Sequence, residues 1–271
     1  MSIRLFLIGL IVWIVQPSLG FAQAGNSEAK AAPSQAMYGL YGFGAAGGDF
    51  PGGLASTEKS TELYTEPGAI GLLGIGWDFG DGVRAELEGR YRSTSIHGIA
   101  TLRDTGLLEP LSNPTGSLSS TAIMANGKYD LPVGGFGRGI RPYIGGGLGY
   151  ASLRFNNAGG LGNTTFYLPL SNTYTSQDIV GFGSGHAFAY QALAGASVPL
   201  GFMPGLEATI EYAYFGTARA DISVSRVATG DTLVNGVTPS NLTKNGFMIH
   251  DQSVTLGLRY YFGASAKAAS R

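Results

Sequence analysis

The chain has 271 residues, enough for one large all-β domain or for two ordinary domains. It contains 44 glycines and no cysteine, and charged residues make up 13% of it, about half the usual share of ~25%. The formal net charge of -1 gives no electrostatic basis for nucleic-acid binding, and the lack of cysteine excludes a disulfide-stapled domain.

The N-terminus has the pattern of a signal peptide. Arg4 precedes the apolar run "LFLIGLIVWIV", and Ala22 and Ala24 form a small-x-small cleavage pattern. The apolar run is shorter than the ~20 residues that a membrane-spanning helix needs. We therefore predict a cleaved signal peptide over residues 1–24 and a flexible leader over residues 25–35; a retained anchor is the alternative.

Short strand-like segments, each of about ten residues, follow the leader. In chain order they are residues 36–45, 68–80, 82–92, 120–131, 140–151, 186–198, 206–216 and 251–262. The two faces of the first segment cannot be distinguished, but the others alternate apolar and polar positions. Eight strands of this length match the smallest outer-membrane barrels.

The third segment, "GVRAELEGRYR", carries the most unusual alternation. Its odd positions are uncharged, and its charges fall on the even ones: Arg84, Glu86, Glu88, Arg90 and Arg92. In a water-soluble sheet such a face would meet solvent, whereas in an outer-membrane barrel it would face the lumen and the uncharged face would meet lipid.

The spacing of the segments favours the barrel. The connections after the second, fourth and sixth segments are short, while those after the first, third, fifth and seventh run roughly 20 to 33 residues. This alternation places every long connection at one end, as in barrels with short periplasmic turns and long extracellular loops. We expect an eight-stranded antiparallel up-and-down transmembrane β-barrel over residues 36–262. Its structureless extracellular loops would cover approximately residues 46–67, 93–117, 152–184 and 217–246.

Aromatic residues fall into two bands one strand length apart, as the two interfaces of a bilayer select. One band lies toward the short connections and the other toward the long ones. The first contains Trp77, Phe79, Tyr129, Tyr260 and Phe262, and the second contains Tyr91, Tyr150, Phe188, Tyr190 and Tyr214.

Several blocks together resemble the OmpA-like outer-membrane β-barrel superfamily, in particular its opacity and surface-antigen (porin-like) branch. They are "GWDFGDGVRAELEGRYR", "MANGKYDL", "RPYIGGGLGYA", "FAYQALAG", "EYAYFG" and "SVTLGLRYYF". The resemblance implies a barrel in the outer membrane of a Gram-negative bacterium. It also implies that the barrel-assembly machinery reads a terminal aromatic residue, here Phe262, although residues 263–271 follow it as a predicted flexible periplasmic tail.

The inward side chains of such a barrel should fill its narrow lumen. Because an unpaired buried charge is costly, we predict an ion-pair network that plugs the lumen, with Lys128 paired to Glu86 or Glu88. Arg259 would pair with Glu207 or Glu211. Ion passage through the lumen is the alternative. The predicted network comprises Arg84, Glu86, Glu88, Arg90, Arg92, Lys128, Glu207, Glu211 and Arg259.

Catalytic and metal sites receive little support. The three histidines, His97, His186 and His250, are scattered, and with no cysteine they make no metal-binding spacing. In "HDQS", His250 and Ser253 would point to opposite faces of a strand, which breaks a nucleophile-base pair. We predict no catalytic residue, no metal and no cofactor.

The predicted function is that of an outer-membrane surface protein, structural or adhesin-like, whose loops contact a host or extracellular ligand. Its other expected partners are outer-membrane lipid and the barrel-assembly machinery, and no nucleic acid is expected. A small-solute channel is the first alternative, and an outer-membrane lipid-modifying enzyme is the second.

Overall fold

The computed structural model describes residues 38–52, 54–56, 61–102, 108–110, 112–132, 139–167, 173–229 and 240–262, and these are almost entirely β-structure. The predicted signal peptide, leader and tail, residues 1–24, 25–35 and 263–271, lie outside the described residues. The strands are β1 (Gly39–Pro51), β2 (Leu54–Ser56), β3 (Thr61–Thr65), β4 (Gly68–Asp78), β5 (Val83–Leu102), β6 (Leu108–Pro110), β7 (Ser112–Asp130), β8 (Arg141–Tyr167), β9 (Thr173–Phe182), β10 (Ser184–Pro199), β11 (Leu206–Thr217), β12 (Ala220–Thr229), β13 (Ser240–Met248) and β14 (His250–Tyr261).

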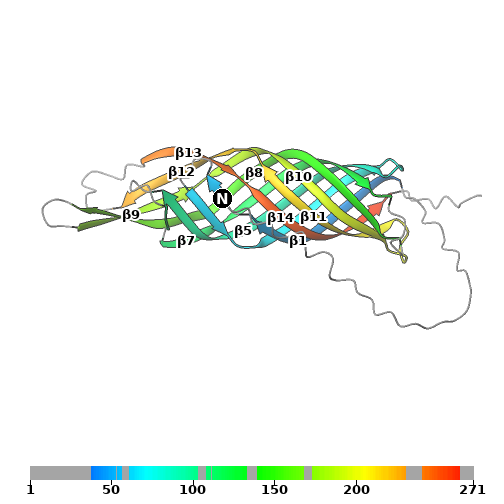
Figure 1. The fold of residues 1–271 in the computed structure, drawn as a ribbon, viewed down its shortest axis with the longest axis horizontal. Helices are drawn as coiled ribbons and strands as arrows, with labels where there is room; N and C mark the ends of the chain where they lie inside the picture. Colours follow the sequence, from blue (N-terminus) through cyan, green and yellow to red (C-terminus); the bar gives the residue numbers. More distant parts are fainter. Residues whose placement is uncertain are drawn as a thin grey trace, which may run out of the picture. The chain divides into compact units, whose positions relative to one another are not determined.

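Eight of these strands close into an antiparallel barrel. The pairing runs β1, β4, β5, β7, β8, β10, β11 and β14, and β14 pairs back onto β1, for example Tyr261 against Tyr41. These strands form the lattice in the centre of Figure 1. Each corresponds to one of the eight segments expected from the sequence, so the predicted fold class is confirmed.

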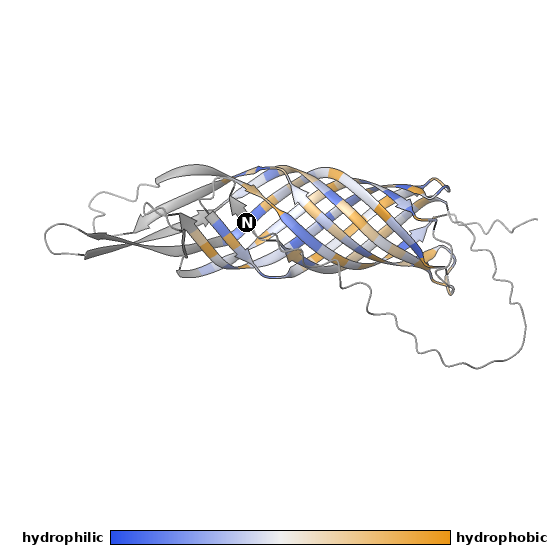
Figure 2. Ribbon diagram, in the orientation of Figure 1, coloured by the Kyte–Doolittle hydropathy of each residue, from blue (hydrophilic) through white to orange (hydrophobic). Residues whose placement is uncertain are grey.

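The barrel has a polar inside and an apolar outside. Along β5 the side chains of Arg84, Glu86 and Glu88 are buried, whereas Val83 and Leu87 between them are exposed. Hydrophobic and hydrophilic residues accordingly alternate along the strands in Figure 2. This arrangement is the reverse of a water-soluble barrel, whose interior is its hydrophobic core.

The exposed outside of the barrel forms an apolar belt. Leu73 on β4 is 72% exposed and Leu256 on β14 is 66% exposed, and Ile75, Ile123 and Leu258 are exposed beside them. Water-soluble monomers rarely expose contiguous apolar surfaces larger than a few hundred Å². The belt is therefore suited to lipid hydrocarbon rather than to water.

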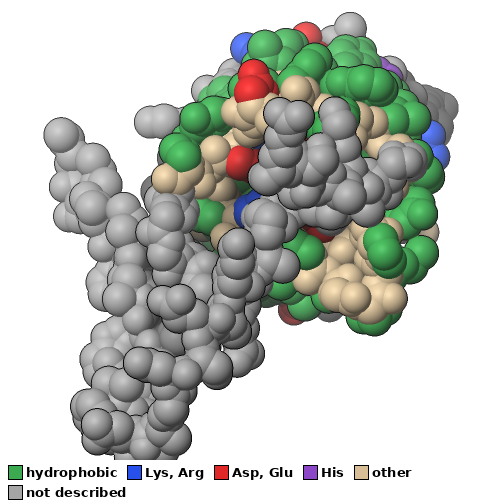
Figure 3. All heavy atoms as spheres, turned by 90° about the vertical axis from the view of Figure 1, so that its right-hand side faces the viewer, with side chains coloured by type: hydrophobic (Ala, Val, Ile, Leu, Met, Phe, Trp, Pro, Cys, Tyr) green, Lys and Arg blue, Asp and Glu red, His purple; other side chains and the backbone are tan. Residues whose placement is uncertain are grey.

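Exposed aromatic side chains border the belt at both ends. At the short-turn end they are Trp77, Phe79, Tyr129 and Phe262, and at the other end they are Tyr91, Tyr150, Phe188 and Tyr190. Figure 3, which looks onto the short-turn end, shows hydrophobic side chains around its margin. Eight of the ten aromatic residues expected in the two bands are thus exposed on the outer face, and the other two, Tyr214 and Tyr260, are half-buried.

The turn between β4 and β5 shows how the short connections are built. The carboxylate of Asp78 accepts a hydrogen bond of 2.9 Å from the backbone N–H of Gly80, and that of Asp81 accepts one of 3.1 Å from Val83. Gly80 and Gly82 have φ angles of 87° and 89°, a region that favours glycine. The "DFGDG" sequence therefore fixes a tight reversal.

The long connections differ from their expected form. They were predicted as structureless loops, but their described parts contain β2, β3, β6, β9, β12 and β13, and β5, β7 and β8 run far beyond the predicted ten residues. We call these six strands, together with the ends of β5, β7 and β8 that extend beyond the barrel, the distal extension. Its β8, β9, β12 and β13 reach farthest from the barrel in Figure 1.

The distal extension continues the hydrogen-bonded ring of the barrel. From β5 the pairing passes through β3, β2, β13, β12 and β9 to β8, which pairs with β7, which in turn pairs with β5. The physical reason is that β5 and β8 run beyond the closed barrel, where their edges would leave N–H and C=O groups unpaired. There β3 and β6 pair with β5, and β9 pairs with β8. The sequence signal for these strands is uneven: β2 and β6 are only three residues long, whereas in β12 the buried Ala220 and Ile222 alternate with the exposed Asp221.

The inside of the distal extension is apolar where its side chains are described. We call this group the distal core, and its members are Leu63, Ile96, Ile99, Leu118, Leu153, Phe155, Ala187, Ala220, Ile222, Phe247 and Ile249. Phe155 and Phe247 pack with their ring centroids 6.2 Å apart. The interior therefore changes from charged to apolar along the barrel axis.

Candidate functional site: the filled lumen

The lumen is filled by charged and polar side chains that the strand alternation turns inward. All five charged residues of "RAELEGRYR" are buried, and Lys128, Glu207, Glu211 and Arg259 are buried with them. Strand pairing stacks these groups into four successive layers along the axis. Each layer contains at least one cation beside a carboxylate, as burial of charge requires.

The first layer lies at the short-turn end. Arg84 donates to the carboxylate of Asp130 at 2.5 Å, and Arg259 donates to Glu207 at 3.1 Å. Arg141 also pairs with Glu207, so that this carboxylate lies between two guanidinium groups. The hydroxyl of Tyr261 donates to Asp78 at 3.0 Å.

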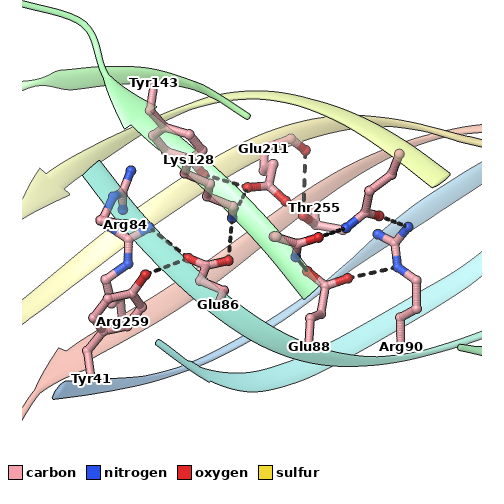
Figure 4. Close-up of polar contacts among 12 residues, drawn as sticks. Tyr41, Arg84, Glu86, Glu88, Arg90, Lys128, Tyr143, Glu211, Thr255 and Arg259 are labelled. Atoms are coloured by element: carbon pink, nitrogen blue, oxygen red, sulfur yellow. Dashed lines mark hydrogen bonds and ion pairs between the residues drawn. The ribbon is translucent and has the colours of Figure 1, made fainter. Parts of the chain in front are cut away.

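The second layer is centred on Lys128, as Figure 4 shows. Its ammonium nitrogen lies 2.8 Å from the carboxylate of Glu86 and 2.6 Å from that of Glu211. The hydroxyl of Tyr41 donates to Glu86 at 2.8 Å, and that of Tyr143 donates to Glu211 at 2.9 Å. One cation therefore bridges strands β5, β7 and β11, and each carboxylate has a second donor.

The third layer combines one ion pair with two amides. Arg90 pairs with Glu88 at 3.0 Å, and the side-chain nitrogen of Asn126 donates to Glu88 at 3.1 Å. Gln191 donates to Asn126 at 2.6 Å and accepts from Arg90 at 2.5 Å. These contacts form a closed polar ring across β5, β7 and β10.

The fourth layer adjoins the distal core. Arg92 pairs with Asp251 on β14 and lies 3.7 Å from the carboxylate of Asp49 on β1. Its guanidinium lies 3.9 Å from the ring centroid of Phe215, a cation–π geometry. The apolar distal core begins above this layer with Leu118 and Ile249.

The space left between these layers is small. One cavity, lined by Lys128, Glu211 and Arg259, has a volume of about 20 Å³. A second cavity, beside Arg92 and Asp251, has a volume of about 10 Å³. Each has the size of one or two waters rather than of a transported solute.

All nine residues of the predicted network thus lie in the lumen. Of the two partners predicted for Lys128, Glu86 forms the ion pair, and of the two predicted for Arg259, Glu207 does. Glu211 pairs with Lys128 instead of Arg259. Arg259 also lies 3.9 Å from Glu86.

Sequence reasoning left five charged residues out of the network. Asp130 and Asp251 share the strand parity of Lys128 and Arg259, and Arg141 lies on the face opposite the apolar one of its segment, which were usable signals. Asp49 gave none, because the first strand alternates glycine, alanine and aromatic residues without a polar face. Asp78 lies at the start of a turn. The omitted residues are Asp49, Asp78, Asp130, Arg141 and Asp251.

Phe262 lies outside the lumen at the short-turn end. Its side chain is 52% exposed, and its backbone N–H donates to the carbonyl of Leu40 at 2.8 Å. Its ring contacts that of Tyr260 edge-on, with 5.5 Å between the centroids. The last strand therefore ends with this aromatic pair at the edge of the apolar belt.

The histidines lie away from the lumen, and each is beside a tyrosine. His186 stacks on Tyr150, and the Nδ1 atom of His250 lies 2.9 Å from the Tyr214 hydroxyl. Ser253 is buried inside, whereas His250 is half-buried and lies with Tyr214. Among the residues that the structure describes, no three His, Cys, Asp or Glu side chains are placed to hold a metal ion.

The sequence also matches a known protein family. The family model described as "Outer membrane protein beta-barrel domain" matches residues 18–262. The chain belongs to this family. Membership agrees with the inverted polarity of the barrel and places the protein in the outer membrane. Within the part of the chain that is described, no helix is both long and apolar enough to cross a membrane.

Individual members and solved barrels are more distant. A protein of Gluconacetobacter diazotrophicus named "Outer membrane protein" is 29% identical over 215 residues, which are 77% of this chain. The aligned part is 50% of that relative, so the chain spans about half the length of the curated relative it matches.

Two crystal structures of outer-membrane proteins are similar to the barrel. The first is Neisserial surface protein A (14% identity, TM-score 0.43), and the match covers 82% of this chain and 97% of that one. The second is OprG from Pseudomonas aeruginosa (15% identity, TM-score 0.43), with 83% and 97% covered.

Proposed function

We propose that this outer-membrane barrel protein is a non-conducting surface protein, structural or adhesin-like, whose distal extension contacts an extracellular ligand. The observation that carries the proposal is the filled lumen: four layers of paired charges are followed by the distal core. The proposal includes the absence of catalysis and membership of the OmpA-like opacity and surface-antigen branch, for which the sequence blocks are the support.

A path for ions would have to cross two unlike barriers. In the charged layers, Lys128 and Arg90 are held by carboxylates within 3.0 Å, which leaves few free charges to attract a passing ion. In the distal core, apolar side chains such as Leu153 and Phe247 are fully buried. Transfer of an ion through such an apolar layer is unfavourable.

The orientation follows from the two unlike ends. We propose that the distal extension lies outside the cell and the short turns lie in the periplasm, as is usual for such barrels. In this orientation residues 1–24 are the cleaved signal peptide, and the assembly machinery reads Phe262 at the periplasmic end. The exposed aromatic side chains of Phe50 and Tyr64 near the extension are available for contact with a ligand.

Planar-bilayer recording of the purified, refolded protein tests the closed lumen. We expect membranes to stay silent at protein amounts at which a general porin gives steady steps. Reproducible channels of one conductance would contradict the proposal and favour the small-solute channel.

A whole-cell experiment tests the surface role. Proteolysis of intact cells should cut only within the distal extension, and cells carrying the uncut protein should bind more extracellular-matrix or host-cell material than cells after cutting. Cleavage confined to the short turns would reverse the proposed orientation, and unchanged binding after cutting would refute the adhesin-like role.

A further inference from the structure

A small polar chamber lies between the fourth layer of the lumen and the distal core. Its polar wall is formed by Asp49, Arg92, Thr94, Ser120 and Asp251, which come from β1, β5, β7 and β14. Leu118 and Ile249 of the distal core cover it. The volume of the chamber is about 10 Å³, which suits one water or one small ion.

Several oxygen atoms of the chamber make no hydrogen bond with the protein. Both carboxylate oxygens of Asp49 are in this position, although the side chain is fully buried. The hydroxyl oxygens of Thr94 and Ser120 are also without a hydrogen-bond partner, and these residues are 5% and 3% exposed. One donor of the chamber, the Nη2 atom of Arg92, also lacks a partner. Because buried polar groups are normally satisfied, the chamber has room and oxygen atoms for a ligand that the chain itself does not supply.

The charge of the chamber indicates what that ligand is. Arg92 donates a hydrogen bond to Asp251, and its ion pair with Asp49 is longer, at 3.7 Å. One guanidinium therefore faces two carboxylates. The third layer does not supply the missing positive charge, because its Arg90 is paired with Glu88. A buried excess of one negative charge favours a cation of one positive charge.

We propose that the chamber binds one small monovalent cation of the size of sodium. Its ligands are the carboxylate of Asp49 and the hydroxyl oxygens of Thr94 and Ser120, with Asp251 as the second carboxylate. Oxygen atoms of this kind suit hard cations. A divalent ion would overcompensate the charge next to the Arg92 guanidinium, and a water molecule would satisfy the hydroxyls but leave the charge unbalanced.

The cation would join four strands at the level where the membrane barrel gives way to the distal extension. It would therefore stabilise the closed state of the lumen, and it does not depend on what the surface of the protein contacts. The bilayer and whole-cell experiments above test the proposed function separately.

Thermal unfolding of the full-length protein in detergent micelles at pH 8 tests the site. Sodium chloride is compared with choline chloride at the same concentration, because choline is too large for the chamber and ionic strength is then equal. We expect the unfolding midpoint to be about 2–4 °C higher in sodium. Asp49→Asn should abolish the difference, whereas Asp221→Asn, which removes an exposed carboxylate elsewhere, should keep it.

Two further measurements decide the case if Asp49→Asn does not fold. Thr94→Val keeps the shape of the side chain but removes one ligand, and it should reduce the sodium effect. Crystals soaked in a thallium(I) salt should show an anomalous peak within the chamber. Equal midpoints of the wild-type protein in sodium and choline, or a chamber without such a peak, would overturn the proposal and leave a single water as its occupant.

Discussion

Lys128 shows why single residues in the lumen have large effects. Its ammonium group is almost fully buried and lies within hydrogen-bond distance of two carboxylates from different strands. Charges in such surroundings are expensive to bury, and they are tolerated because each is held by several partners. Glu86 illustrates this, since it also accepts from Tyr41 and lies 3.9 Å from Arg259.

Replacement of Lys128 by methionine should therefore be strongly destabilising. Methionine keeps much of the side-chain volume but leaves Glu86 and Glu211 without their shared cation. We expect the free energy of unfolding to fall by about 3–5 kcal/mol, as for other broken buried ion pairs. Urea-induced unfolding in lipid vesicles, followed by tryptophan fluorescence, measures it.

The matched control removes one of the two carboxylates that lose their cation. The double variant Lys128→Met with Glu211→Gln should be more stable than Lys128→Met alone, because only Glu86 then lacks its cation. A double variant that is less stable than the single one would show that Lys128 contributes packing rather than charge neutralisation.

At the scale of elements, β7 and β8 fit together through the lumen. The three inward positions of β8 that follow Tyr143 are glycines, and the inward side chains of β7 occupy the space beside them: Gly145, Gly147 and Gly149. A methyl group added to Gly147 would lie 1.9 Å from the Oδ1 atom of Asn126 and 3.0 Å from the carbonyl oxygen of Ala125. The glycines of "GGGLG" thus leave space inside the barrel for the polar side chains of β7.

Substitution of Gly147 by alanine should disturb this fit. The clash forces Asn126 away from Glu88 and Gln191, so we expect a loss of about 1–3 kcal/mol in the free energy of unfolding. Gly127→Ala is the control, because an added methyl group there meets nothing within 4 Å and would face outward. Similar unfolding curves for the two variants would refute the role assigned to Gly147.

The strands of the membrane barrel could be predicted from sequence because their alternation is strong. In "RAELEGRYR" every second residue is charged, and that pattern fixes which face is inside. The partners across the lumen could not be read in this way. Arg90 reaches Gln191, 101 residues away, only because of strand order, tilt and side-chain length together.

The distal extension escaped prediction for a different reason. Its segments are rich in Ser, Thr, Gly and Asn, which are common in loops, and β2 and β6 are too short to show an alternation. The alternation of Ala220 and Ile222 with Asp221 in β12 was a usable signal. The chamber was hidden for another reason: Asp49 lies at the end of a Gly-, Ala- and aromatic-rich first strand that has no polar face in the sequence.

At the scale of the whole molecule, polar and apolar residues are separated in two directions. Around the barrel, apolar residues face outward and charges face inward, as the outer membrane requires; along its axis, the interior changes from charged to apolar where the distal extension begins. The first division follows from the lipid. The second gives the distal extension a hydrophobic core of its own, larger than the cluster of Ala122, Met124, Ala151, Ala189 and Phe215 among the charged layers of the barrel.

The lipid-facing belt makes a prediction that depends on depth in the bilayer. Leu256 lies near the middle of β14, opposite Ala46 on β1 and Ile210 on β11, and is 66% exposed. Leu256→Arg should reduce the free energy of unfolding in lipid vesicles by about 2–4 kcal/mol, whereas an arginine at an interface costs about 0–1 kcal/mol. Phe202→Arg, in the short turn between β10 and β11, is the interfacial control. If both variants lose the same free energy, the belt does not lie in the hydrocarbon region where its exposed leucines and isoleucines place it.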